Sequence, residues 1–220
     1  MRLVEHRVSD VGVLDKAVLV LDALAGGAKG LGELVTATAL PRATAHRLAV
    51  ALEVHGLVRR DGDGRFALGT RLIALGRASA GGFPLVEAAR PALERLREET
   101  GESVQLYVVD GAGRRCVASL DSPNELRTIV AVGSVLPLER GSAGKVLRPE
   151  AAAGRRGWAE SVEEREPGVA SVSAPVRDGH GDVVAAVSVS GPVGRMSRQP
   201  GRLHAAVVVA AAAAIESAIR

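Results

Sequence analysis

Residues 31–68 read LGELVTATALPRATAHRLAVALEVHGLVRRDGDGRFAL. The stretch begins with a short helical segment. A second helix follows from Pro41, which suits a first helical position, to Gly56, a typical helix stop. Two short strand-forming runs then flank residues 61–64, which have the composition of a hairpin turn. Helix, turn, helix and hairpin in this order predict a winged helix-turn-helix.

One more helix precedes this stretch. Leu14, Val18, Leu21 and Leu24 recur at helical spacing, and a glycine pair follows them as a stop. Three short helices and a hairpin therefore fill residues 1–69, which we expect to form a winged helix-turn-helix DNA-binding domain.

The second helix of the motif has an apolar face, made by Ala45, Leu48, Ala49 and Leu52, that should pack on the other helices. In such motifs the start of this helix enters the major groove, where arginine pairs with guanine edges, while hairpin arginines meet the DNA backbone or minor groove. The candidate DNA-contacting residues are Arg42, Thr44, His46, Arg47, Arg59, Arg60 and Arg65. Basic charge alone also fits a solvated helical face, but combined with the element order it favours DNA.

The distribution of charge supports the same interpretation weakly. The chain has a formal net charge of +3, and residues 1–82 contain 11 Lys and Arg against 8 Asp and Glu. Residues 83–220 contain 17 of each kind, so the excess positive charge lies in the first part of the chain.

The remaining sequence predicts a linking helix over residues 70–82 and a second domain over residues 83–220. An amphipathic helix over residues 85–100 directs Val86, Leu93 and Leu96 toward a core. Strand-like runs follow at residues 103–110, 116–120, 128–132, 168–177 and 182–190, and a last helix covers residues 202–219. The fold class is therefore α+β, with an antiparallel sheet and flanking helices.

Composition and motifs argue against several other classes. The single cysteine, Cys116, excludes an intrachain disulfide and a cysteine zinc site. Met1–Asp10 does not read as a signal peptide, and the apolar run Ala205–Ile215 is shorter than the ~20 residues of a membrane span. No nucleophile elbow, phosphate-binding loop, dinucleotide fingerprint or metal-ligand cluster occurs. We therefore expect a cytoplasmic protein without catalytic residues, cofactor, metal or membrane partner.

Several segments together resemble the IclR family of transcriptional regulators. They are VLDKAVLVL at 13–21, PRATAHRL at 41–48, GRFALG at 64–69, GSAGK at 141–145, RGWA at 156–159, EREPGVASVSAPV at 164–176 and AVSVSGP at 186–192. The resemblance covers nearly the whole chain in order, and it is strongest to an actinobacterial subgroup that regulates amino-acid biosynthesis, including leucine genes.

The resemblance implies a GAF- or PAS-like effector domain that binds an amino acid or another small carboxylate. Its implied effector-contacting residues are Ser142, Ala143, Ser161, Ser171, Ser188 and Ser190. Serine hydroxyls and the backbone amides of the 141–145 loop suit a carboxylate. Taken by spacing alone, alternating serines fit the solvent face of a strand better. Ser171 stands where some relatives carry cysteine.

The resemblance further implies a homodimer or dimer of dimers on double-stranded operator DNA, joined through the first helix and the linking helix. One departure from the family is plain. Between GSAGK and RGWA the family has a longer segment with at least one helix, whereas here only residues 146–155 intervene. A dimerisation module that binds a ligand without reading DNA, and an enzyme, remain as alternatives.

Overall fold

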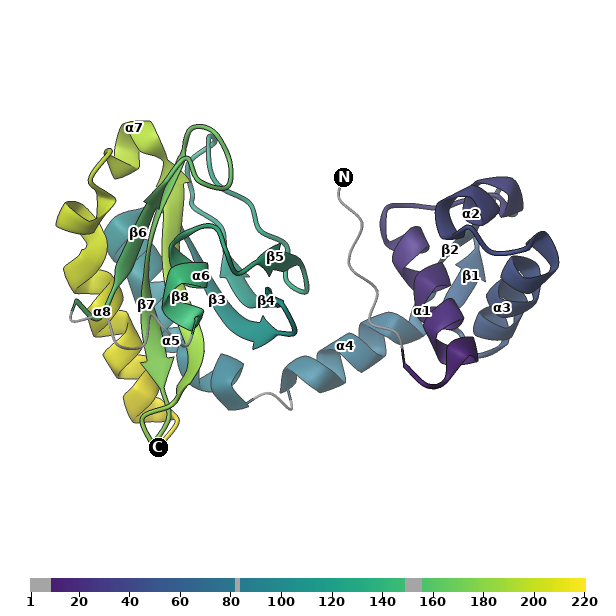
Figure 1. The fold of residues 1–220 in the computed structure, drawn as a ribbon, viewed down its shortest axis with the longest axis horizontal. Helices are drawn as coiled ribbons and strands as arrows, with labels where there is room; N and C mark the ends of the chain where they lie inside the picture. The colour runs from purple at the N-terminus through teal and green to yellow at the C-terminus, as the bar shows by residue number, and fades with distance from the viewer. Residues whose placement is uncertain (1–8, 82–83, 149–155) are drawn as a thin grey trace. The chain divides into compact units, whose positions relative to one another are not determined.

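The computed structural model describes residues 9–81, 84–148 and 156–220. The chain divides into two compact units, residues 1–82 and residues 83–220, each with its own core. Figure 1 shows the order of their elements along the chain.

The first unit has the predicted helix-turn-helix and hairpin. Its elements are α1 (Gly12–Ala25), α2 (Leu31–Thr38), α3 (Arg42–Val54), β1 (Val58–Arg60), β2 (Phe66–Leu68) and α4 (Arg71–Gly81). β1 and β2 pair antiparallel, with Val58 opposite Leu68. Ala39 ends α2 in the left-handed conformation, and Pro41 stands just before the first residue of α3.

The core of this unit confirms the apolar face of α3 and corrects that of α1. Ala45, Ala49 and Leu52 of α3 are buried. On α1 the buried residues are Val20 and Leu24, whereas 56 % of Leu14 and 44 % of Val18 is exposed. The helical spacing predicted for α1 is confirmed, but Leu14 and Val18 are not part of this core, which α1 contacts through Ala17, Val20, Leu21 and Leu24.

One glycine fixes the junction between the hairpin and α4. A Cβ built on Gly69 would lie 2.1 Å from the carbonyl oxygen of Gly56, closer than any real contact. The Gly69 amide also donates to the Leu57 carbonyl at 2.8 Å. Only glycine therefore allows the chain after β2 to pass so near the end of α3.

The second unit is α+β, as predicted. Its sheet has six antiparallel strands in the order β5-β4-β3-β8-β7-β6. The strands are β3 (Ser103–Asp110), β4 (Gly113–Leu120), β5 (Val135–Pro137), β6 (Ala159–Val162), β7 (Val169–Arg177) and β8 (Val183–Pro192), and the helices are α5 (Pro84–Thr100), α6 (Ser142–Leu147), α7 (Val193–Met196) and α8 (Pro200–Ala218).

The two faces of this sheet carry different cores. α5 and α8 cover one face, where Val172, Val187 and Val189 are buried against Leu93 and Val208. α6 lies on the opposite face, above Tyr107, Cys116 and Ala186. Because side chains alternate along a strand, the serines between these valines point to the α6 face.

The strand predicted at residues 128–132 is absent, and the edge strand is β5 instead. The Cys116 N–H donates to the Ser134 carbonyl oxygen, and the Cys116 carbonyl oxygen accepts from the Gly133 N–H. A turn therefore occupies the edge of β4 at this point. Ladder pairing then begins with Val135 opposite Arg115. β6 and α7 were not predicted, because four-residue elements carry too little periodicity.

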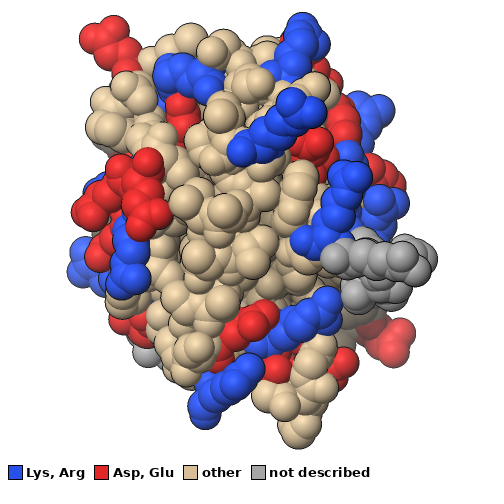
Figure 2. Space-filling view, turned by 90° about the vertical axis from the view of Figure 1, so that its left-hand side faces the viewer, with Lys and Arg blue, Asp and Glu red and all other residues tan. Residues whose placement is uncertain are grey.

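α8 is the one helix in the described part of the chain that is long and apolar enough to cross a membrane by length and composition. Ala205, Val208, Ala212 and Ile215 are nevertheless buried in the core of the second unit. The view toward this side in Figure 2 shows a central band without charged side chains, bordered by basic and acidic residues. The inner face of α8 is therefore buried in the core, and its outer face also carries apolar side chains, among them Leu203 and Val209.

Candidate functional site

The start of α3 exposes basic and polar side chains. Arg42, His46 and Arg47 are exposed, and Thr44 is half-buried, whereas Ala45 is fully buried beneath them. The helix therefore has one face buried in the core and one exposed face with basic side chains. All four predicted residues of α3 lie at its N-terminal end, where a recognition helix contacts base edges.

The three hairpin arginines differ in what they already contact. The Arg60 guanidinium lies 4.1 Å from the centre of the Phe66 ring, donates to the Gly64 carbonyl at 2.9 Å and pairs with Glu53 at 3.4 Å. Arg65 donates to the Ala28 carbonyl at 2.6 Å and pairs with Glu33.

Within the residues that the structure describes, Arg59 is exposed and has no hydrogen bond or ion pair of its side chain. Two of the three predicted hairpin arginines are therefore already engaged within the unit, Arg60 with the hairpin and α3, and Arg65 with Ala28 and α2. Arg59 is the one whose guanidinium is free to meet a phosphate.

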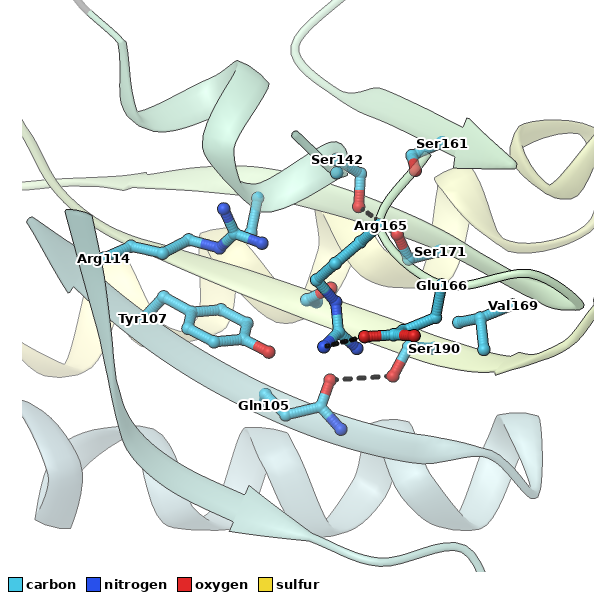
Figure 3. A pocket seen from close by; sticks show the side chains of 13 residues that line it. Gln105, Tyr107, Arg114, Ser142, Ser161, Arg165, Glu166, Val169, Ser171 and Ser190 are labelled. Carbon is cyan, nitrogen blue, oxygen red and sulfur yellow. Dashed lines mark hydrogen bonds and ion pairs between the residues drawn. The ribbon is translucent and has the colours of Figure 1, made fainter. Parts of the chain in front are cut away.

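The α6 face of the second sheet contains a small cavity (Figure 3). All six residues implied for effector binding line it: Ser142, Ala143, Ser161, Ser171, Ser188 and Ser190. The cavity measures about 30 Å³, room for one or two water molecules. The structure thus brings together residues that are up to 48 positions apart in the sequence.

Strand register explains why the serines meet. Ser161 pairs with Ser171 across β6 and β7, and Ser171 pairs with Ser190 across β7 and β8. Ser173 pairs with Ser188 in the next row. Ser188 and Ser190 are only 3 % and 6 % exposed, so these serines do not form the solvent face of a strand.

Hydroxyl groups form a chain across the floor of the cavity. The Ser142 Oγ lies 2.7 Å from the Oγ atoms of both Ser171 and Ser173, and Ser173 donates to the Ser188 Oγ at 2.9 Å. The Ser190 Oγ donates to Gln105 Oε1 at 3.0 Å. Gln105 Nε2 is buried and has no hydrogen-bond partner among the residues that the structure describes.

Glycines place the first turn of α6 against Leu138, the residue that follows β5. Gly141 has φ +84°, and a Cβ on Gly144 would lie 2.2 Å from the Leu138 carbonyl oxygen. The Gly141 amide donates to Glu164 Oε2 at 3.1 Å. This amide, expected from the sequence to be open to an anion, already has a carboxylate partner from within the chain.

The cavity also contains groups that sequence reasoning did not assign: Gln105, Tyr107, Arg114, Arg165, Glu166 and Val169. Arg114 is 3 % exposed, donates to the carbonyl oxygens of Pro137 and Arg140, and lies over the Tyr107 ring. Burial, the larger cause, and the neighbouring Arg165 lower the pKa of the Arg114 guanidinium, while burial raises the pKa of Tyr107. A buried cation beside a neutral phenol favours a negatively charged or polar ligand.

Cys116 is fully buried, as expected of a small core residue, and does not line the cavity. Burial raises the pKa of its thiol to about 11, against a smaller opposing effect of the hydrogen bond involving Ala118. At pH 8 about one thiol in a thousand is then ionised.

Iodoacetamide should therefore modify the Cys116 thiol very slowly in the native protein and rapidly in the denatured protein. Fast modification of the native protein would contradict the burial of this thiol.

The same shift has a defined pH dependence. Because the pKa is higher in the folded protein than in the unfolded one, the contribution of the neutral thiol to stability is complete below about pH 9 and is lost as the pH rises through about 11. Chemical denaturation at pH 8 and pH 11 would measure this loss against a Cys116→Ser variant.

Comparison with known proteins gives a consistent family assignment. A family model described as the IclR helix-turn-helix domain matches residues 13–62. A second, the C-terminal domain of the bacterial transcriptional regulator IclR, matches residues 78–153 and 151–217. The second match is in two pieces that overlap at residues 151–153.

Individual relatives cover most of the chain. The glycerol operon regulatory protein of Streptomyces griseus is 31 % identical over 217 residues, covering 83 % of this chain and 85 % of that protein. The transcriptional repressor IclR of Escherichia coli K12 is 25 % identical and covers 84 % and 81 %. The crystal structure of an IclR homologue from Microbacterium hydrocarbonoxydans complexed with 4-hydroxybenzoate has a TM-score of 0.82 at 23 % identity, covering 94 % of this chain and 99 % of that one.

Proposed function

The chain belongs to the IclR family of ligand-responsive, DNA-binding transcriptional regulators, and from that premise we propose which of its residues read DNA and which bind the effector. Residues 1–69 bind operator DNA, residues 70–82 link the two functions, and residues 83–220 bind the effector. Because the target is operator DNA, we place the protein in the cytoplasm, and we propose no catalytic activity.

DNA reading is proposed for the start of α3 and for the hairpin. Arg42 and Arg47 contact base edges, Thr44 and His46 contact edges or phosphates, and Arg59 contacts the DNA backbone. The observation that carries this assignment is the two-sided α3, which is buried at Ala45 and Ala49 and exposed at its arginines. A gel shift with the promoter DNA of the protein's own gene tests it, and failure to shift any promoter fragment would favour a dimerisation module that does not read DNA.

Effector binding is proposed for the cavity on the α6 face, with a small carboxylate or amino acid as ligand. The six lining residues from α6, β6, β7 and β8 and the unpaired Gln105 amide support this assignment. Regulation of amino-acid metabolism, including leucine genes, is proposed from the sequence resemblance alone. Because one relative is named for a glycerol operon, a thermal-shift screen should contain amino acids, small carboxylates and glycerol.

The wing assignment makes a specific prediction. Arg59→Ala should weaken binding to all DNA sequences alike and reduce the slope of log affinity against log salt by about 1, since one phosphate contact is lost. Arg65→Ala should instead lower the melting temperature of the first unit within the full-length protein. The Ala28 carbonyl and the Glu33 carboxylate would both lose the guanidinium that they contact. Fluorescence anisotropy at several salt concentrations measures the first effect. An unchanged slope in Arg59→Ala would remove Arg59 from the interface.

We also propose a homodimer, or a dimer of dimers, with α1 and α4 as contacts. Val13 and Leu14 of α1 are 64 % and 56 % exposed, and Ile73 of α4 is 57 % exposed. Isolated apolar side chains at such exposure are ordinary, but two helices of one unit that both expose them favour a partner surface. Light scattering should give a dimer or tetramer at micromolar concentration.

The matched variants for this prediction are Leu14→Glu and Lys16→Glu on the same helix. Leu14→Glu should shift the protein toward the monomer and lose operator affinity, because a charge would be buried in the interface. Lys16→Glu changes an exposed residue and should leave the oligomeric state unchanged. A wild-type monomer that binds its operator specifically would refute the assignment.

A further inference from the structure

The loop between β6 and β7 places two charged side chains in the cavity. In Figure 3 the Arg165 side chain extends into the centre of the cavity, and the Glu166 carboxylate lies beside its guanidinium. The two groups are 3.9 Å apart, the Arg165 side chain is 25 % exposed and the Glu166 side chain is 58 % exposed. At this distance and exposure the pair is weak, so Arg165 is only partly neutralised.

The other lining residues do not supply a better partner for Arg165. The charged residues of the cavity are Arg114, Arg165 and Glu166, so two cations face one carboxylate. Arg114 is fixed by the carbonyl oxygens of Pro137 and Arg140, and it lines the same cavity as Arg165. Gln105, which also lines the cavity, has a buried Nε2 without an acceptor in the described part of the chain. Excess donors and excess positive charge in one small space fit an anionic ligand, and guanidinium binds carboxylate in a two-point geometry.

The loop is fixed on either side of Arg165 and Glu166. Glu164 pairs with Lys145 and accepts from the Gly141 amide, which ties the loop to the start of α6. Glu163 accepts from the Gly168 amide at 3.0 Å and pairs with Arg198. With these anchors in place, the side chains of Arg165 and Glu166 can move while the backbone of the loop stays where it is.

The size of the cavity depends on these same two side chains. About 30 Å³ does not accommodate a ligand of several heavy atoms while both remain in place. Of the two side chains Glu166 is the more exposed, and an anionic ligand that displaced its carboxylate would keep a counterion beside Arg165. A neutral ligand of the same shape would leave Arg165 without a counterion.

We propose that Arg165 selects the charge of the effector and that Glu166 is the internal carboxylate that an anionic effector displaces. This assignment rests on the proposed effector function of the cavity. It names two specificity residues from a loop that the sequence pattern did not connect to ligand binding.

The test uses matched acids and amides as probes. Acetate, propionate and benzoate are titrated by calorimetry at constant ionic strength beside acetamide, propionamide and benzamide, with the full-length wild type and the variants Arg165→Gln, Arg165→Lys and Glu166→Gln. Arg202→Gln and Glu98→Gln, exposed residues on α8 and α5, remove the same charges away from the cavity. Melting curves without probe check that each variant is folded.

We expect the tightest-binding acid to bind Arg165→Gln at least tenfold more weakly, with partial recovery in Arg165→Lys, which keeps the charge but not the two-point geometry. Glu166→Gln should bind the acid about two- to fivefold more tightly. The ion pair between Arg165 and Glu166 no longer lowers the fraction of protein molecules whose Arg165 is free to bind the acid. The amides should respond to neither change, and both control variants should behave as the wild type.

The outcomes separate the two levels of the proposal. Acid binding that is equal in the wild type and Arg165→Gln would overturn the role of Arg165 while the effector function stands. Weaker acid binding in Glu166→Gln would overturn its displacement. Wild-type protein that binds none of the acids would overturn the carboxylate class of effector and the charge selection together.

Discussion

Replacing Arg42 and Arg47 together by alanine is expected to weaken operator binding by about 30-fold to 25,000-fold, since each base contact of this kind contributes about 1–3 kcal/mol. Both side chains are exposed on α3, whereas the buried residues Ala45 and Ala49 hold that helix in the unit. The loss should therefore come from the interface and not from unfolding. Binding to non-specific DNA should fall much less, because only the two charges are lost there.

Anisotropy titrations with operator and with scrambled DNA at one salt concentration measure both affinities. The control is Arg90→Ala with Arg202→Ala, which removes two exposed arginines from the second unit. Melting temperatures of both double variants should stay close to that of the wild type. Equal losses on operator and scrambled DNA would show that the two arginines contact only phosphates, and no loss at all would remove α3 from the interface.

The DNA-binding unit could be predicted well from sequence because its signals are local. The apolar face of α3 repeats at helical spacing, and the glycine-rich turn between β1 and β2 marks the hairpin. What sequence could not decide is which arginines are already engaged. The sequence does not distinguish Arg59, Arg60 and Arg65. In the structure Arg60 contacts Phe66 and Glu53, and Arg65 donates to the Ala28 carbonyl, whereas Arg59 has no such partner among the described residues.

The cavity was only partly predictable, because it depends on pairing between distant strands. The alternation of valine and serine on β8 predicts that the two kinds of side chain point to opposite faces of the sheet. It does not predict whether the serine face is covered by another element or exposed to solvent. The resemblance supplied that choice, and the position of α6 over the serines agrees with it. Arg114 was missed because the predicted strand began at Cys116, and Arg165 was missed because it stands in an acidic run that resembles a solvated loop.

Replacing Ser188 and Ser190 together by valine is expected to abolish the effect of the effector on operator binding. In the wild type, coupling of about 1–3 kcal/mol would change operator affinity about 5–150-fold between the free and bound forms. Valine removes two hydroxyls from the cavity floor and fills part of a space of about 30 Å³. The residues proposed to contact DNA all lie outside the second unit, so operator affinity without effector should remain that of the wild type.

The substitution also disturbs the hydrogen bonds of the second unit, which the experiment must take into account. Ser173 loses its acceptor at Ser188, and Gln105 loses the donor at Ser190 while its Nε2 is already unpaired. Each buried group left without a partner costs about 1–3 kcal/mol of stability. Ser188→Ala alone, which removes one hydroxyl without adding volume, provides a milder variant of the same surface, and Ser217→Val on the exposed side of α8 provides the control.

Operator titrations measure how each variant's operator affinity changes with effector concentration. The effector is the ligand that binds most tightly in the thermal-shift screen. The control should show the wild-type shift, Ser188→Ala a shift that needs more effector, and the double variant no shift at any concentration reached. Because an effector acts only through its different affinity for two arrangements of the regulator, loss of binding and loss of response should appear together. A folded double variant that responds at the wild-type concentration would place the effector outside the serine-lined cavity.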